Sequence, residues 1–158
     1  MTRLLALAVL LALLISTTAC GTIHSPAEIS QLETHELIDE WNHYTYWGWP
    51  GSSLVLATQN SSGVDRATWT RSMRAAAVHR LAGAYRWTPE ECALVNQGQV
   101  QAGISITAAH WVLGKAKRRD WSDGPQGRWE HWRYDGPPQI TYTFHDNALV
   151  WWSSYSDR

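Results

Sequence analysis

Cysteine is scarce in this chain of 158 residues, and neither sign of charge is in excess. Two cysteines are too few to build a small domain from disulfides. The 13 basic and 14 acidic residues leave a formal net charge of −1, whereas affinity for nucleic acid phosphates requires clustered lysine and arginine. We therefore exclude a disulfide-built scaffold and expect no nucleic acid partner.

Phenylalanine is nearly absent too, with one residue against 11 tryptophans and 6 tyrosines. Most of the aromatic surface thus carries a polar N–H or O–H group. The apolar share of 44% excludes a fully disordered chain. The length predicts one domain, or one domain with a short appendage.

The first 20 residues have the pattern of a secretion signal. Arg3 precedes an apolar run over residues 4–15, which is shorter than the ~20 residues needed to span a bilayer. Small residues follow, as at a signal peptide cleavage site. The sequence Ala19-Cys20-Gly21 resembles the lipobox of bacterial lipoproteins, although Thr17 stands where that family usually has leucine.

The lipobox resemblance implies that residues 1–19 are a signal peptide and that Cys20 becomes the acylated N-terminus. The alternative is an ordinary signal peptide with a chance cysteine. No aspartate follows Cys20, and such an aspartate retains enteric lipoproteins in the inner membrane. The resemblance therefore implies an outer-membrane lipoprotein, facing the periplasm. Cys92 then has no partner in the chain, and we expect it to be a small buried residue.

Residues 20–97 are predicted to form a helical extension next to the lipid anchor. Polar N-caps precede three apolar-periodic segments, and the first and third also have the glutamate of a capping box. These caps are Ser25, Asp65 and Thr88. We expect the three helices to end near residues 43, 85 and 97, the last at Gly98.

Residues 98–158 are predicted to form an α+β module. Ser105 caps a short helix, and Gly114 ends it with a positive φ. Turn signals then separate three predicted strands, at residues 128–134, 139–145 and 148–155. Short turns between strands predict a three-stranded antiparallel meander with helices packed on one face.

This module resembles the SmpA/OmlA family, which includes the BamE lipoprotein of the β-barrel assembly machinery. The resemblance covers about residues 98–153 and rests on a helix that ends in Leu-Gly, an aromatic–Tyr strand and a Tyr-x-Phe strand. The matching positions are Val100, Gly103, Leu113, Gly114, Trp132, Tyr134, Tyr142, Phe144 and Leu149 or Val150. Ala116 departs from a common proline, and residues 25–97 exceed the compact members.

The resemblance implies a BamE-like fold, similar also to the modules of the β-lactamase inhibitor protein. It implies binding of envelope or outer-membrane proteins rather than catalysis, with a link to outer-membrane protein assembly. The lipobox resemblance implies attachment to the membrane through the N-terminal lipid. The matching residues are core and turn positions, which indicate a fold more directly than a function.

Few side chains have the spacing of a catalytic or metal site. His35, Asp39 and His43 recur every four residues, but the two histidines lie about 12 Å apart along a helix, too far to share one ion. We therefore expect no enzyme, no metal and no cofactor. The basic run at residues 115–119 is interpreted as a solvated strand start, with contact to phospholipid head groups as the alternative.

The tryptophans are the candidates for a binding surface. Five aromatic residues fall within residues 41–49. They either cover a small core, bind a protein, lie at the membrane interface or stack on sugar rings. Adjacent strand residues point to opposite faces, as do residues three apart. The candidate binding residues are Trp47, Trp49, Trp129, Trp132, Trp151 and Trp152.

We expect at least two of these tryptophans to lie together on the sheet face away from the short helix, as a docking surface partly shaped by residues 41–49. Burial of that face under the N-terminal helices would contradict this. The alternative function is a periplasm-facing lipoprotein that holds a glycan or a lipid head group on a Trp-rich surface.

Overall fold

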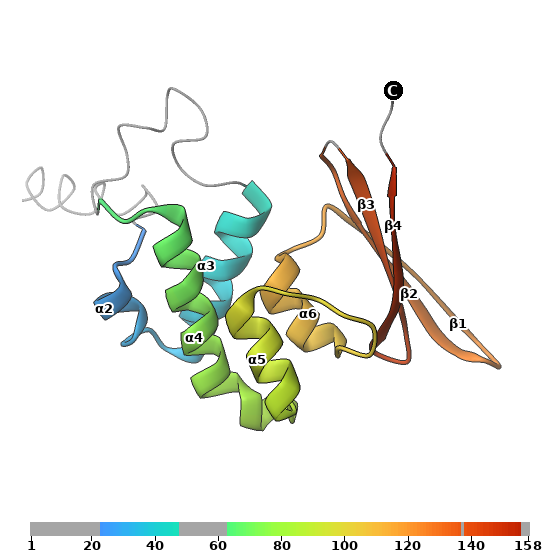
Figure 1. Cartoon of the computed structure of the whole chain (residues 1–158), viewed down its shortest axis with the longest axis horizontal. Helices are drawn as coiled ribbons and strands as arrows, with labels where there is room; N and C mark the ends of the chain where they lie inside the picture. The colour runs from blue at the N-terminus through green and yellow to red at the C-terminus, as the bar shows by residue number, and fades with distance from the viewer. Residues whose placement is uncertain (1–22, 48–62, 137, 156–158) are drawn as a thin grey trace, which may run out of the picture.

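The computed structural model describes residues 23–47, 63–136 and 138–155. Within these ranges five helices precede four strands, and the fold class is α+β, as predicted. The helices lie on one side of the sheet, with α6 between it and the other helices (Figure 1). The elements are α2 (Pro26–Ile29), α3 (Thr34–Trp47), α4 (Arg66–Tyr85), α5 (Pro89–Gln97), α6 (Ile106–Leu113), β1 (Arg118–Gly124), β2 (Gly127–Tyr134), β3 (Gln139–His145) and β4 (Ala148–Tyr155).

The sheet is an antiparallel meander in the order β1-β2-β3-β4. The three predicted strands are present as β2, β3 and β4, but the expectation of three strands was wrong, because β1 adds a fourth. Sequence periodicity missed β1 because Arg118, Arg119, Asp120 and Asp123 interrupt any apolar alternation. Such charged side chains suit an edge strand, where they discourage pairing with another chain.

The predicted helix caps are confirmed, with one error in helix length. Capping boxes form at Ser25 and Thr88, and side chains at Asp65 and Ser105 also cap their helices. The single helix expected up to residue 43 is instead two helices, because the chain turns after Ile29, which is buried in the core. A second start follows, and α3 continues to residue 47.

A stack of three indoles forms the centre of the helical core. The ring of Trp41 in α3 lies 5.6 Å from that of Trp69 in α4 and 5.2 Å from that of Trp111 in α6. The Trp41 indole N–H donates to the carbonyl of His110 at 3.1 Å. Tyr44 is buried beside the stack and meets Trp69 edge to face. Trp41 and Tyr44, two of the five aromatic residues within residues 41–49, therefore belong to the core.

The junction between helices and sheet is built around the end of α6. Gly114 has φ 77° and ψ −169°, so the predicted positive φ is confirmed, although its ψ lies outside the left-handed helical region. A Cβ at this position would lie 2.9 Å from Cγ2 of Thr45 in α3, and closer still to the Thr45 Cβ. This glycine thus permits close approach of the α6–β1 connection to α3. Cys92 is only half-buried and packs against the core, less deeply than expected.

Candidate functional site

The sheet has one face packed on α6 and one face that no described helix covers (Figure 1). Directly paired residues share a face, and Trp132 pairs with Tyr142, which pairs with Trp152. Trp132 is 2% exposed and lies edge to face against His110 of α6, so this row faces the helices. Trp129 and Trp151 therefore lie on the other face, which we call the open face.

The open face carries a group of aromatic and imidazole rings. The rings of Trp129 and His145 lie 4.3 Å apart. His131 and Trp151 flank Thr143 on the two neighbouring strands, and Thr143 is only 1% exposed although none of the described helices lies over it. The Thr143 hydroxyl and His131 Nδ1 are within hydrogen-bonding distance, at 3.0 Å. These side chains cover their part of the sheet without help from another element.

The free edge of β4 is the most apolar exposed part of the described chain. Val150, Trp151, Trp152 and Tyr155 are 39%, 50%, 49% and 67% exposed. Residues 103–106 cover only the beginning of this edge, where Gly103 donates to the Leu149 carbonyl at 2.7 Å. Since β4 carries no charged side chain, its edge differs sharply from that of β1.

The structure separates the six predicted binding residues. Trp151 and Trp152 are half-exposed on opposite faces of β4, and Trp129 is half-buried on the open face. Trp132 is buried and unavailable to a protein partner. The side chain of Trp47, together with Trp49 and the lipidation residue Cys20, lies outside what the structure describes. The described part of segment 41–49 lies in α3, on the helical side, and does not shape the open face.

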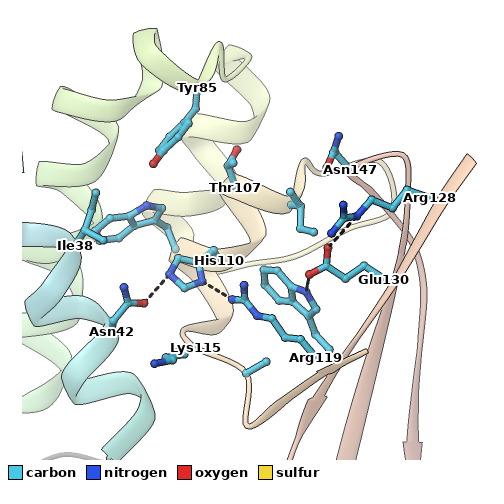
Figure 2. A pocket seen from close by; sticks show the side chains of 14 residues that line it. Ile38, Asn42, Tyr85, Thr107, His110, Lys115, Arg119, Arg128, Glu130 and Asn147 are labelled. Carbon is cyan, nitrogen blue, oxygen red and sulfur yellow. Dashed lines mark hydrogen bonds and ion pairs between the residues drawn. The ribbon is translucent and has the colours of Figure 1, made fainter. Parts of the chain in front are cut away.

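A second candidate site is a cavity of about 780 Å³ between α3, α6 and the strands β1 and β2. His110 lies at its centre, with Asn42 of α3 on one side and Arg119 of β1 on the other (Figure 2). The His110 Nε2 atom lies 2.9 Å from Asn42 Oδ1, and Nδ1 lies 3.2 Å from Arg119 Nη2. Since Asn42 Oδ1 can only accept and Arg119 can only donate, Nε2 carries the proton and Nδ1 accepts.

Burial and nearby cations keep this imidazole neutral. Burial, then Arg119, then Lys115 lower the pKa of His110 to about 4. Unperturbed histidine titrates near pH 6.5. The neutral ring therefore links Asn42 to Arg119 at physiological pH and adds no charge to the cavity.

The opposite wall of the cavity holds a carboxylate with two partners of its own. Glu130 accepts a hydrogen bond from the Trp132 indole N–H at 2.6 Å, and its other oxygen lies 3.9 Å from Arg128 Nε (Figure 2). Arg119 lies over the Trp132 ring, with its guanidinium carbon 3.9 Å from the centre of the indole. The cavity is thus a polar cluster built on an aromatic floor.

Sequence reasoning did not find this cluster. Asn42 and His110 are 68 residues apart, and His110 falls in no ligand spacing. The basic run at residues 115–119 was its only signal in the sequence. Histidines 35 and 43 are exposed on α3 with Asp39, and no group of three potential metal ligands occurs among the described residues.

Comparisons of the chain with models of protein families, with curated proteins and with solved structures found no match. Within residues 23–47, 63–136 and 138–155, no helix is both long enough and apolar enough to cross a membrane.

Proposed function

We propose that this chain is a non-catalytic outer-membrane lipoprotein that binds other envelope proteins through the free edge of β4. The observation that carries the proposal is the exposure of Val150, Trp151, Trp152 and Tyr155 on an uncharged edge strand. Edge strands are normally protected from pairing by charge, as β1 is. Contiguous exposed apolar residues mark interaction sites, and tryptophan and tyrosine are enriched in interface hot spots.

The position of β4 relative to the proposed lipid anchor supports this function. Ile23, three residues after Cys20 in the sequence, is 5% exposed and belongs to the core. Three residues reach at most about 11 Å, which would hold the α2 end of the molecule against the membrane surface. The sheet lies at the other end of the long axis (Figure 1). The free edge of β4 would therefore face the periplasm, where protein partners are accessible.

The resemblance of residues 98–153 to the SmpA/OmlA family points to the same class of function. Its members are lipoproteins that act with other envelope proteins, and the lipobox-like sequence at Cys20 is consistent with such an anchor. Assembly of outer-membrane proteins is the process that this resemblance favours. The proposal does not depend on a catalytic group.

Co-purification tests the proposal. The lipidated chain would be isolated in mild detergent with its bound proteins, and compared with Trp151→Ser and Trp152→Ser. Trp121→Ser is the matched control, because Trp121 is 63% exposed but lies on the opposite edge strand. We expect a defined protein partner to be lost from both β4 variants and retained by the control. Equal recovery with all four proteins would overturn the proposal.

A further inference from the structure

The cavity at His110 has more positive than negative charge. Lys115, Arg119 and Arg128 line it together with the single carboxylate of Glu130. Glu130 lies nearest to Arg128 among these cations, at 3.9 Å from its Nε atom. Arg119 and Lys115 lie on the other side, close enough to His110 that both lower its pKa. This side of the cavity therefore favours an anion.

The guanidinium of Arg119 is preorganised to bind such an anion. Its guanidinium is held over the Trp132 ring at 3.9 Å, and Nη2 donates to His110 Nδ1 at 3.2 Å. No carboxylate of the described residues lies within ion-pair distance of it. A guanidinium has five N–H donors, so the histidine uses only one. A fixed, planar fork of this kind matches the oxygens of a phosphate or carboxylate.

Apolar side chains form much of the cavity wall on the helical side, together with Thr107. Tyr85, Trp111, Ile38 and Ile106 line it on the helical side, and Figure 2 shows Ile38 and Tyr85 across the cavity from Arg119 and Glu130. A volume of about 780 Å³ is in the range of small-molecule sites, which combine apolar walls with a few fixed polar groups. The occupant should therefore have an apolar body as well as an anionic group.

We propose that this cavity binds a phosphate monoester carried on an aromatic or other apolar body. A phosphate monoester has a charge of about −1.5 to −2 at pH 7, which matches the two cations beside His110. Arg119 would bind two phosphate oxygens, and Lys115 would add a point charge. Asn42 and His110 act as positioning residues that orient Arg119. This site is separate from the β4 edge.

Calorimetric titration of the full chain in a non-ionic detergent tests the site. The probes are phenyl phosphate, inorganic phosphate, benzyl alcohol and benzoate. We expect phenyl phosphate to bind at least tenfold more tightly than each of the other three. Vesicles with and without phosphatidic acid distinguish a lipid source of the monoester from a soluble one, since only a lipid ligand would make binding depend on that lipid.

Arg119→Gln should weaken phenyl phosphate binding at least tenfold, and Arg119→Lys should restore only part of the loss. Arg118→Gln is the matched control. The side chain of Arg118, next to Arg119 in β1, points to the open face and pairs with Asp120 at 3.0 Å. Its affinity should stay within twofold of the wild type. Lys115→Gln provides a second test if Arg119→Gln does not fold. Absence of phenyl phosphate binding, equal losses in the Arg118 and Arg119 variants, or equal binding of benzyl alcohol would overturn the proposal. Tighter binding of benzoate would overturn the assignment of a phosphate.

Discussion

Arg119 lies directly over Trp132, its partner across the β1–β2 ladder, with the guanidinium carbon 3.9 Å from the centre of the indole ring. This contact holds the Arg119 guanidinium beside the cavity that both residues line. A cation–π contact of this kind stabilises by about 0.5–2 kcal/mol. The strand that sequence periodicity missed thus supplies one of the charged groups that line the cavity.

Protonation of His110 should destabilise the protein in acid. Its pKa is about 4 when folded and near 6.5 when unfolded. Because the unfolded state binds the proton first, the stability that depends on neutral His110 is complete above pH 6.5 and is lost as the pH falls towards 4. Denaturant unfolding at pH 7 and pH 4.5 should show about 2–3 kcal/mol more loss for the wild type than for His110→Gln. Equal losses in the two proteins would contradict the buried neutral imidazole.

Replacement of Gly114 by alanine should destabilise the fold strongly. A Cβ there adds backbone strain at φ 77° and overlaps the side chain of Thr45. We expect thermal unfolding to report a loss of about 3 kcal/mol or more. Gly103→Ala is the control, since φ is 93° there but no atom lies within 4 Å of the added Cβ. That variant should lose only about 1–2 kcal/mol, and a similar loss in both would refute the close contact with α3.

The buried carboxylate of Glu40 should be important for stability. One oxygen accepts from the Trp69 indole N–H at 2.8 Å, and the other contacts Nδ1 of His24. Glu40→Ala removes the carboxylate from both contacts and should cost about 2–4 kcal/mol of unfolding free energy. Glu90→Ala, at an exposed position in the first turn of α5, should cost less than about 1 kcal/mol. Chemical denaturation of the two variants compares them directly.

Cys20 is predicted to anchor the protein in the membrane. Cys20→Ser removes the acceptor of the lipid, so the protein should leave the outer-membrane fraction or remain unprocessed. Cys92→Ser is the control and should fractionate as the wild type does, because Cys92 is a free, half-buried thiol in the helical core. Unchanged fractionation of the Cys20 variant would show that a lipid on this residue is not the anchor.

Local signals in the sequence predicted four of the five described helix starts, all but that of α3, and three of the four strands. A capping residue acts within its own turn, so Ser25, Thr88 and Ser105 can be interpreted without knowledge of the fold. The same holds for the alternation of Tyr142 and Phe144 in β3. The α2–α3 break was missed because the apolar spacing continues across it, although the chain turns at residues 30 and 31 before α3 begins.

The candidate sites depend on tertiary contacts that spacing does not show. The sequence predicts that Trp151 and Trp152 point to opposite faces, and the structure confirms it, but whether helices cover either face depends on how the chain packs. The cavity joins α3, α6 and β1, which pack together only in the folded chain. Asn42, His110 and Arg119 have no common pattern in the sequence.

Photo-cross-linking in intact cells gives the sharpest test of protein binding at the free edge of β4. A photoreactive amino acid would replace Tyr155 on the free edge of β4, and Trp121 on the edge of β1 in the control. We expect a discrete adduct with an envelope protein from position 155 and none from position 121. Identical adducts from both positions, or no protein adduct from position 155, would contradict a docking function of the β4 edge.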